Sequence, residues 1–263
     1  MAERIPPGSS AYPLRDITVQ VHRPAAFTHA SAILMVMHGR KRNGDEYRDY
    51  FVPESERRGF LVVAPHFDEA HYPHPHAYNY GRMIDKAGSL QPRERWIFPL
   101  LDEIFRDVRA RAGSSREKFF IFGHSAGSQL VHRLATFGWM DSIERAVAAN
   151  AGSYTMPVRE ERFPFGVDGL DVSDDDLRKL FSRPLIVLLG DQDVDVNDPD
   201  LPKEPEAMRQ GPFRFARGQR YFETAQREAN RIGAPFNWRL AIAPGIAHSG
   251  KEMAPFAVRQ LAL

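Results

Sequence analysis

The stretch Lys118-Phe-Phe-Ile-Phe-Gly-His-Ser-Ala-Gly127 decides the fold that we predict for this chain. Phe119 to Phe122 is a run of bulky apolar residues with the length of one buried strand, and the pattern Gly-x-Ser-x-Gly follows it at once. Beyond this pattern, apolar residues recur at helical spacing, at Leu130, Val131, Leu134 and Ala135. The stretch therefore predicts a strand, a sharp turn and a helix, with Ser125 at the bend.

Two glycines are expected to make this bend possible. A side chain at position 123 or 127 would collide where the strand and the helix cross, so that only a hydrogen atom fits there. The bend would lift the Ser125 hydroxyl above the carboxyl end of the strand and leave the next backbone N–H free to face an oxyanion. This is the geometry of a nucleophile elbow. The alternative is a plain strand-to-helix turn that uses small residues.

Composition narrows the class of protein. The 263 residues suffice for one large α/β domain, although the length would also allow two. The 35 basic and 34 acidic residues are spread along the chain, so neither nucleic acid nor a membrane is an expected partner. The absence of cysteine excludes disulfides and a thiol nucleophile. No signal peptide or membrane span is apparent, although a targeting segment removed earlier would leave no trace. We expect a single cytoplasmic domain over residues 1–263, with its oligomeric state left open.

Strands and helices are predicted to alternate along the chain. The expected strands cover 16–22, 32–37, 60–64, 119–122, 145–149, 184–190 and 237–243, and the expected helices include 46–58, 96–111, 215–231 and 251–261. Residues 1–14 look like a loose lead-in. Three long stretches, 66–92, 155–183 and 194–214, are expected to be loop insertions, with a capping-box-like helix start at Ser173. This order predicts an α/β fold with a mostly parallel central sheet, helices on both faces, and insertions over the carboxyl ends of the strands.

Candidate partners of Ser125 follow two other predicted strands. A serine hydroxyl needs a base within reach, and the base needs a third group that orients it. In an open α/β sheet, reactive groups gather at the carboxyl ends of the strands. The segment Gly190-Asp-Gln-Asp193 follows the clearest strand, and Pro244-Gly-Ile-Ala-His248 follows the last one. An acid and a histidine are therefore available from different strand ends.

This combination resembles the α/β-hydrolase fold from about residue 16 to the end, including the chain order serine, acid, histidine. The resemblance implies a serine hydrolase with Ser125 as the nucleophile and His248 as the general base and then acid. It also implies an orienting aspartate, which in this family commonly lies three residues beyond the glycine, here Asp193. Asp191 and Asp195 remain the alternatives.

The oxyanion of a tetrahedral intermediate needs two N–H donors. The amide of Ala126 is one expected donor, and the resemblance implies the backbone N–H of Arg40 as the other. Arg40 belongs to His38-Gly39-Arg40, in which the first two residues could alternatively do no more than end a strand. The residues that follow, 41–47, depart from simple lipase patterns. They look more like those of the polymer-depolymerase and feruloyl-esterase-like branch of the fold.

Other histidines and aspartates point to weaker hypotheses. His124 is expected to point away from the Ser125 side chain and to pack, and His132 to lie on the surface or in the core. Three histidines between 71 and 76 alternate with prolines and lack a carboxylate at ligand spacing. The aspartates between 191 and 200 lack the glycine and glutamate of a calcium loop in register. We therefore expect neither a metal site nor a cofactor.

The expected function is the cleavage of a small-molecule or oligomeric carboxylic ester through an acyl-enzyme intermediate. Aromatic residues of the long loops either accept an apolar acyl group or pin the loops to the core: Tyr78, Tyr80, Tyr154, Phe163, Phe165, Phe213 and Phe215. Arg40, Arg42 and Arg82 either meet a substrate carboxylate or lie in water. A peptidase, an amidase or an acyltransferase on the same triad is an alternative, as is a non-catalytic binding protein of this fold.

Overall fold

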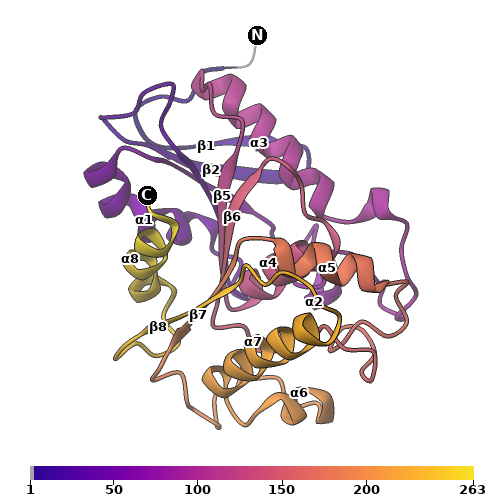
Figure 1. The fold of residues 1–263 in the computed structure, drawn as a ribbon. Helices are drawn as coiled ribbons and strands as arrows, with labels where there is room; N and C mark the ends of the chain where they lie inside the picture. The colour runs from indigo at the N-terminus through magenta and orange to yellow at the C-terminus, as the bar shows by residue number, and fades with distance from the viewer. Residues whose placement is uncertain (1–2) are drawn as a thin grey trace.

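The computed structural model describes residues 3–263, which form one eight-stranded sheet in the order β1-β2-β4-β3-β5-β6-β7-β8 (Figure 1). Strands β3 to β8 are parallel, whereas β1 and β2 run antiparallel to their neighbours. The strands are β1 (Gly8–Leu14), β2 (Ile17–Arg23), β3 (Ile33–Met37), β4 (Leu61–His66), β5 (Phe119–His124), β6 (Ile143–Ala149), β7 (Leu185–Gly190) and β8 (Arg239–Ala243). The predicted mostly parallel α/β sheet is confirmed.

Helices cover both faces of this sheet. They are α1 (Gly44–Arg58), α2 (His74–Ala77), α3 (Phe98–Ala112), α4 (Ala126–Phe137), α5 (Asp174–Ser182), α6 (Pro205–Gln210), α7 (Arg214–Arg231) and α8 (Gly250–Leu261), with a 3₁₀ turn at Arg93–Arg95. In β3, Leu34 and Val36 belong to the core under α1 and α8, whereas Met35 belongs to the core under α3, α4 and α7. Central strands buried on both faces need apolar residues at every position, which explains the continuous apolar runs of the sequence.

The amino-terminal expectation was wrong over residues 8–14, whereas residues 3–7 lie in no helix or strand. Residues 8–14 are not a loose lead-in but form β1, which pairs with β2 along its whole length. Its side chains alternate between partly buried and exposed because β1 is an edge strand, so the sequence carries little apolar signal there. Residues 1 and 2 of the same stretch lie outside the described part of the chain.

Three smaller boundaries also differ from the expectation. Pro65 does not end its strand but lies within β4, beyond the last β4 residue that pairs with β3, so its missing N–H costs no bond on that side. Two stretches predicted as loops contain the short helices α2 and α6. The helix start predicted at Ser173 is confirmed, since a complete capping box between Ser173 and Asp176 opens α5.

The turn between β5 and α4 has the geometry that its two glycines predict. Ser125 adopts φ 57° and ψ −115°, a strained conformation for a residue with a side chain. A Cβ atom at Gly123 would lie 2.2 Å from the Gly127 carbonyl oxygen, and one at Gly127 would lie 2.2 Å from that of Met37. Only glycine therefore lets strand and helix approach closely enough to present the Ser125 side chain above the sheet.

Within residues 3–263, no helix combines the length and the apolarity that crossing a bilayer requires. The cytoplasmic location and the single-domain organisation of the chain stay predictions.

Candidate active site

Ser125, His248 and Asp193 form one chain of hydrogen bonds at the carboxyl edge of the sheet. Ser125 follows β5, Asp193 follows β7, and His248 lies between β8 and α8. His248 Nε2 lies 3.1 Å from Ser125 Oγ, and His248 Nδ1 lies 2.7 Å from Asp193 Oδ2. Asp193 is only 2 % exposed, because the turn after Gly190 points it inward. The three residues singled out from the sequence are thus brought together.

The two alternative acids lie elsewhere in the described chain. The Asp191 carboxylate accepts a hydrogen bond from the Gly245 N–H at 2.7 Å, and so it ties the β7 loop to the loop that carries His248. The Asp195 carboxylate is exposed and accepts a hydrogen bond from the Asn197 N–H. Among these three aspartates, the contact with His248 belongs to Asp193.

Arg214 is a member of this site that the sequence analysis missed. Its guanidinium Nη1 is buried 3.4 Å from Asp193 Oδ1 and 2.7 Å from Asp198 Oδ2. Burial acts to raise the pKa of the Asp198 carboxyl, but the hydrogen bond and charge of Arg214 outweigh it and lower that pKa. Arg214 therefore holds the second oxygen of Asp193 while the first one faces His248. No sequence signal marks it, since it opens α7 among several other arginines.

The two expected oxyanion donors flank Ser125. The N–H of Ala126 is the first of α4, a position that leaves backbone N–H groups without partners inside the helix. On the other side, a Cβ atom at Gly39 would lie 3.8 Å from the Ser125 Cβ, which places the β3 loop against the nucleophile. Within residues 3–263, the N–H of Arg40 has no hydrogen-bond acceptor. Both amides are thus available beside Ser125.

His38 does more than end strand β3. Its Nε2 accepts a hydrogen bond from the Phe67 N–H at 3.0 Å, which places the ring proton on Nδ1, facing the Gly39 carbonyl at 3.0 Å. Tyr78 stacks on this ring at 4.6 Å and donates its hydroxyl proton to the His38 carbonyl. Burial lowers the pKa of His38 to about 3, so the imidazole is neutral. His38 therefore fastens the loop over residues 66–92 to the oxyanion loop.

His124 and His132 are also buried. His124 lies under the site, with its Nδ1 2.8 Å from the hydroxyl of Tyr47 on α1. His132 lies in the core, where its Nε2 accepts a hydrogen bond from the Thr155 N–H at 3.0 Å. Burial lowers the pKa of both imidazoles well below the ordinary value. Both act as neutral hydrogen-bonding groups.

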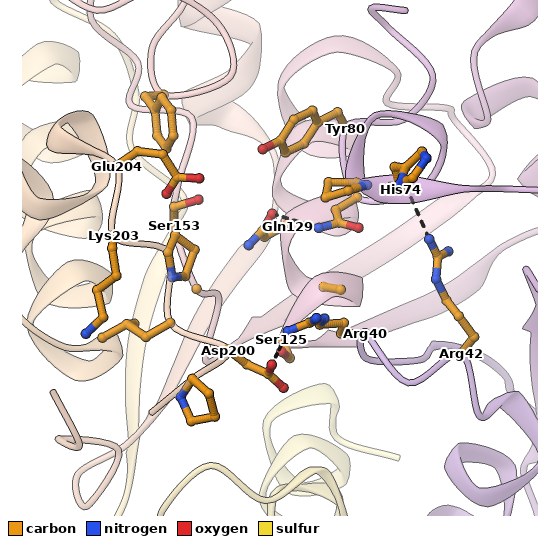
Figure 2. Close-up of a pocket in the computed structure, with 18 of the residues that line it drawn as sticks. Arg40, Arg42, His74, Tyr80, Ser125, Gln129, Ser153, Asp200, Lys203 and Glu204 are labelled. Carbon is orange, nitrogen blue, oxygen red and sulfur yellow. Dashed lines mark hydrogen bonds and ion pairs between the residues drawn. The ribbon is translucent and has the colours of Figure 1, made fainter. Parts of the chain in front are cut away.

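Ser125 lies between two cavities. The larger has a volume of about 550 Å³ and extends from Ala126 over Gln129 to the loops that carry Asn79, Ser153 and Lys203 (Figure 2). The smaller has about 270 Å³ and includes His248, Tyr50 and Lys251. Arg40 and Asp200 border both cavities and form an ion pair with each other beside Ser125. The ion pair thus separates the two spaces next to the nucleophile.

The larger cavity is more polar than an apolar acyl site would be. Of the aromatic residues considered above, Tyr80 and Phe165 line it, whereas Tyr78 and Tyr154 are fully buried in the core, as the pinning hypothesis predicts. Arg42 borders the cavity, but its guanidinium donates to the Tyr72 carbonyl at 2.9 Å and pairs with Glu69. Arg82 lies over the Tyr72 ring, at a different cavity. Within residues 3–263, no cluster of three or more potential ligands is arranged to hold a metal ion.

Comparisons with known proteins identify the family. No family model and no curated protein matches the chain. Among solved structures, it is similar to poly(aspartic acid) hydrolase-1 from Sphingomonas sp. KT-1, with 36% identity, a TM-score of 0.94, and coverage of 97% of this chain and 98% of that one. It is equally similar to a poly(3-hydroxybutyrate) depolymerase from Bordetella parapertussis, with 38% identity, a TM-score of 0.92, and coverage of 97% and 90%.

A more distant structure shares the fold alone. The acetyl xylan esterase from Aspergillus awamori is 12% identical, with a TM-score of 0.61 and coverage of 97% of this chain and 99% of that one. The two relatives above 30% identity, by contrast, match over nearly the whole of both chains. The chain therefore belongs to the α/β-hydrolase family and is a hydrolase of its serine esterase branch.

Proposed function

We propose that this protein cleaves a carboxylic ester through an acyl-enzyme intermediate, with Ser125 as the nucleophile, His248 as the base and Asp193 as the orienting acid. The hydrogen-bond chain from Asp193 through His248 to Ser125 carries this proposal. Because an ionised carboxylate can only accept hydrogen bonds, the proton of His248 lies on Nδ1. The lone pair of Nε2 is then free to receive the Ser125 proton.

The reaction follows from this geometry. Ser125 Oγ attacks the ester carbonyl while its proton passes to His248 Nε2, and Asp193 stabilises the imidazolium. The N–H groups of Ala126 and Arg40 receive the oxyanion, aided by the positive end of the α4 helix dipole. The imidazolium protonates the departing alcohol. Water then attacks the acyl-enzyme by the same route and releases the acid.

The two cavities have different roles in this scheme. The leaving alcohol takes its proton from His248, so it departs on the side of the smaller cavity, which His248 lines. The acyl group then occupies the larger cavity, which includes Ala126 but not His248. We expect substrates with an acyl part bulkier than the alcohol part.

The relatives suggest the substrate class. Both are named for polymers, one a polyamide and the other a polyester. We propose an oligomeric ester as the substrate, with small esters as surrogates; nucleic acid and membranes have no part in the proposal. Amide cleavage on the same triad is the second candidate, favoured by the identity of 36% to the polyamide hydrolase. Matched ester and amide substrates of one acyl group separate the two by their kcat/KM values.

The experiment that tests the mechanism is labelling with a fluorophosphonate. We expect the reagent to modify Ser125 in the wild type, to abolish turnover of short aryl esters, and to leave Ser125→Ala unlabelled. His248→Asn should fold but react slowly with the reagent. A wild-type protein that is neither labelled nor active on any ester of graded acyl length refutes the proposed function.

A further inference from the structure

One side chain in the larger cavity, the proposed acyl site, has a free hydrogen-bond donor in a fixed position. Gln129 lies one helical turn beyond Ser125 on α4, and its N–H bonds to the Ser125 carbonyl at 3.0 Å. The side chain lines the larger cavity although Gln129 is only 6 % exposed. Figure 2 shows it pointing into the middle of the cavity, with Ser153 on one side and Ser125 below it.

The oxygen of the Gln129 amide is already occupied. Gln129 Oε1 accepts a hydrogen bond from Asn79 Nδ2 at 3.2 Å and faces Arg133 Nη1 at 3.4 Å. The Nε2 group must then point the other way, toward Gly152. A Cβ atom added at Gly152 would lie 3.2 Å from Gln129 Nε2. Within the described chain, Gln129 Nε2 donates to no acceptor, yet it is not sealed from the cavity.

Arg133 fixes this orientation of the Gln129 side-chain amide. It is fully buried, and its guanidinium donates to Thr155 Oγ1 at 2.9 Å, to the Asn79 carbonyl at 2.9 Å and to the Pro164 carbonyl at 3.1 Å. Burial lowers the pKa of Arg133 only to about 10, so the group is a cation at neutral pH. A cation that can only donate excludes the flipped amide, because the Nε2 protons would then face it.

We propose that Gln129 Nε2 binds a hydrogen-bond acceptor on the acyl chain of the substrate, which rests on the proposed function above. The Cβ atoms of residues one turn apart on a helix are about 5–6 Å apart, and we therefore expect the acceptor about three or four bonds beyond the scissile carbonyl. A carbonyl or a carboxylate at this place satisfies the donor. A plain alkyl chain displaces water and leaves the donor unpaired, which disfavours it about ten- to hundredfold. The site therefore selects acyl groups with a second oxygen function.

Three methyl esters of similar length test this selection: methyl pentanoate, methyl 4-oxopentanoate and monomethyl succinate. Their hydrolysis is followed by base consumption at constant pH. We expect the wild type to prefer one or both of the oxygen-bearing esters over the pentanoate by about tenfold or more in kcat/KM. The keto ester and the succinate distinguish a neutral carbonyl from a carboxylate as the bound group. A wild type without any preference overturns the inference.

Substitution of Gln129 assigns the preference to this residue. In Gln129→Leu, the preference for the oxygen-bearing ester over the pentanoate should fall at least tenfold, because kcat/KM for the former drops while that for the pentanoate, which no longer leaves a donor unpaired, rises. Gln129→Glu is a second variant that keeps the contact with Arg133 but offers no donor, and it should lose the preference as well. Gln260→Leu on α8 is the control and should match the wild type. Equal losses for all three esters overturn the inference.

The failure of the proposed function would look different from the failure of this inference. If fluorophosphonate labels Ser125 at the wild-type rate in Gln129→Leu, the nucleophile and its partners are intact in that variant. Unchanged ester preference together with intact labelling refutes the role of Gln129 alone. Absent labelling of the wild type refutes the hydrolytic mechanism itself.

Discussion

The imidazole of His124 lies against that of His248, with ring centroids 4.6 Å apart and ring planes inclined by 34°. Burial holds the pKa of His124 well below its ordinary value, and the charges of His248 and Arg214 act in the same direction. The Tyr47 hydroxyl lies 2.8 Å from Nδ1 of this ring and is also close to Gly39 and Gly250. A neutral ring anchored to α1 therefore supports the imidazole proposed as the base, between the oxyanion loop and the start of α8.

Removal of the support that Tyr47 and His124 give to His248 should impair catalysis, because the imidazole of His248 would be held less well in position. Tyr47→Phe removes one buried hydrogen bond, and we expect it to lower the free energy of unfolding by about 1 kcal/mol and kcat by severalfold. His124→Ala removes the ring itself and leaves a cavity under His248. We expect a loss of about 2 kcal/mol or more, and a larger fall in kcat than in Tyr47→Phe. Urea unfolding and ester kinetics measure both quantities.

The pH dependence of kcat/KM shows whether His124 and Tyr47 only support His248 or also take part in proton transfer. His124 is neutral near pH 7, and the charged groups that face it and His248 include Arg214, Asp193 and Asp198. In Tyr47→Phe, the acidic limb of kcat/KM should therefore stay where it is in the wild type while the plateau drops. A limb displaced by a full pH unit would mean that His124 or Tyr47 takes part in the titration.

Asp191 and Asp195 serve as controls for the orienting role proposed for Asp193. Asp193→Asn would present an amide to His248 Nδ1, disturb its tautomer and lower kcat on the order of 10⁴-fold. Asp191→Asn and Asp195→Asn should keep kcat within about threefold, since neither carboxylate contacts His248. Steady-state kinetics of the three variants measures these changes in kcat. A major loss in Asp191→Asn with an active Asp193→Asn would reverse the assignment.

The sequence predicted what depends on local pattern and missed what depends on distant contacts. The glycines around Ser125 indicated the elbow because close crossing of a strand and a helix excludes a Cβ atom. Asp193 and His248 were found because both follow recognisable buried strands. No sequence pattern predicts the roles of Arg214, Gln129 and Tyr47, because these roles depend on contacts between segments that are distant in the chain. Strand β1 was missed because an edge strand needs no apolar alternation.

The proposed oxyanion role of Arg40 concerns its backbone and not its side chain. Arg40→Ala keeps the N–H and removes the ion pair with Asp200, so kcat should change less than about tenfold. It should also relax selectivity for alcohol size, since the pair separates the two cavities. Arg40→Pro removes the N–H and should lower kcat about 10²- to 10³-fold.

Folding must be verified for this pair of variants. Both should unfold at urea concentrations close to that of the wild type, because Arg40 lies in an exposed loop and its pair with Asp200 is solvent-accessible. Equal kcat values for Arg40→Ala and Arg40→Pro, with both proteins folded, would remove Arg40 from the oxyanion site.

The capping box of α5 offers a test of stability without an effect on catalysis. Ser173 accepts a hydrogen bond from the Asp176 N–H, and the Asp176 carboxylate accepts one from the Ser173 N–H. Ser173→Ala should lower the free energy of unfolding by about 1 kcal/mol. Ester hydrolysis should be unchanged, because α5 borders neither cavity at Ser125. Ser89→Ala is the matched control and should cost less, because Ser89 is exposed and its hydroxyl makes no hydrogen bond within residues 3–263.

Three buried neutral histidines should make the protein acid-sensitive. His38, His124 and His132 have pKa values lowered by burial, to about 3 in His38. The charges of Arg42, Arg214 and Arg133 face these three rings, in that order, and act in the same direction. In the unfolded chain, each imidazole titrates at about 6.5. Below that pH the unfolded state binds more protons, so the stability contributed by the neutral rings is complete above pH 6.5 and is lost as the pH falls.

The expected loss is about 1.4 kcal/mol per histidine for each pH unit below 6.5, or about 4 kcal/mol for the three together. His71 opposes this trend, since Asp68 raises its pKa, but that pair is exposed and contributes little. Urea unfolding at pH 7.5 and pH 5.5 measures the difference. In His132→Gln the dependence on pH should shrink by about a third, whatever the variant's stability at pH 7.5. A wild type equally stable at both pH values would mean that these rings accept protons while folded, and the neutral forms assigned to His38 and His124 would be wrong.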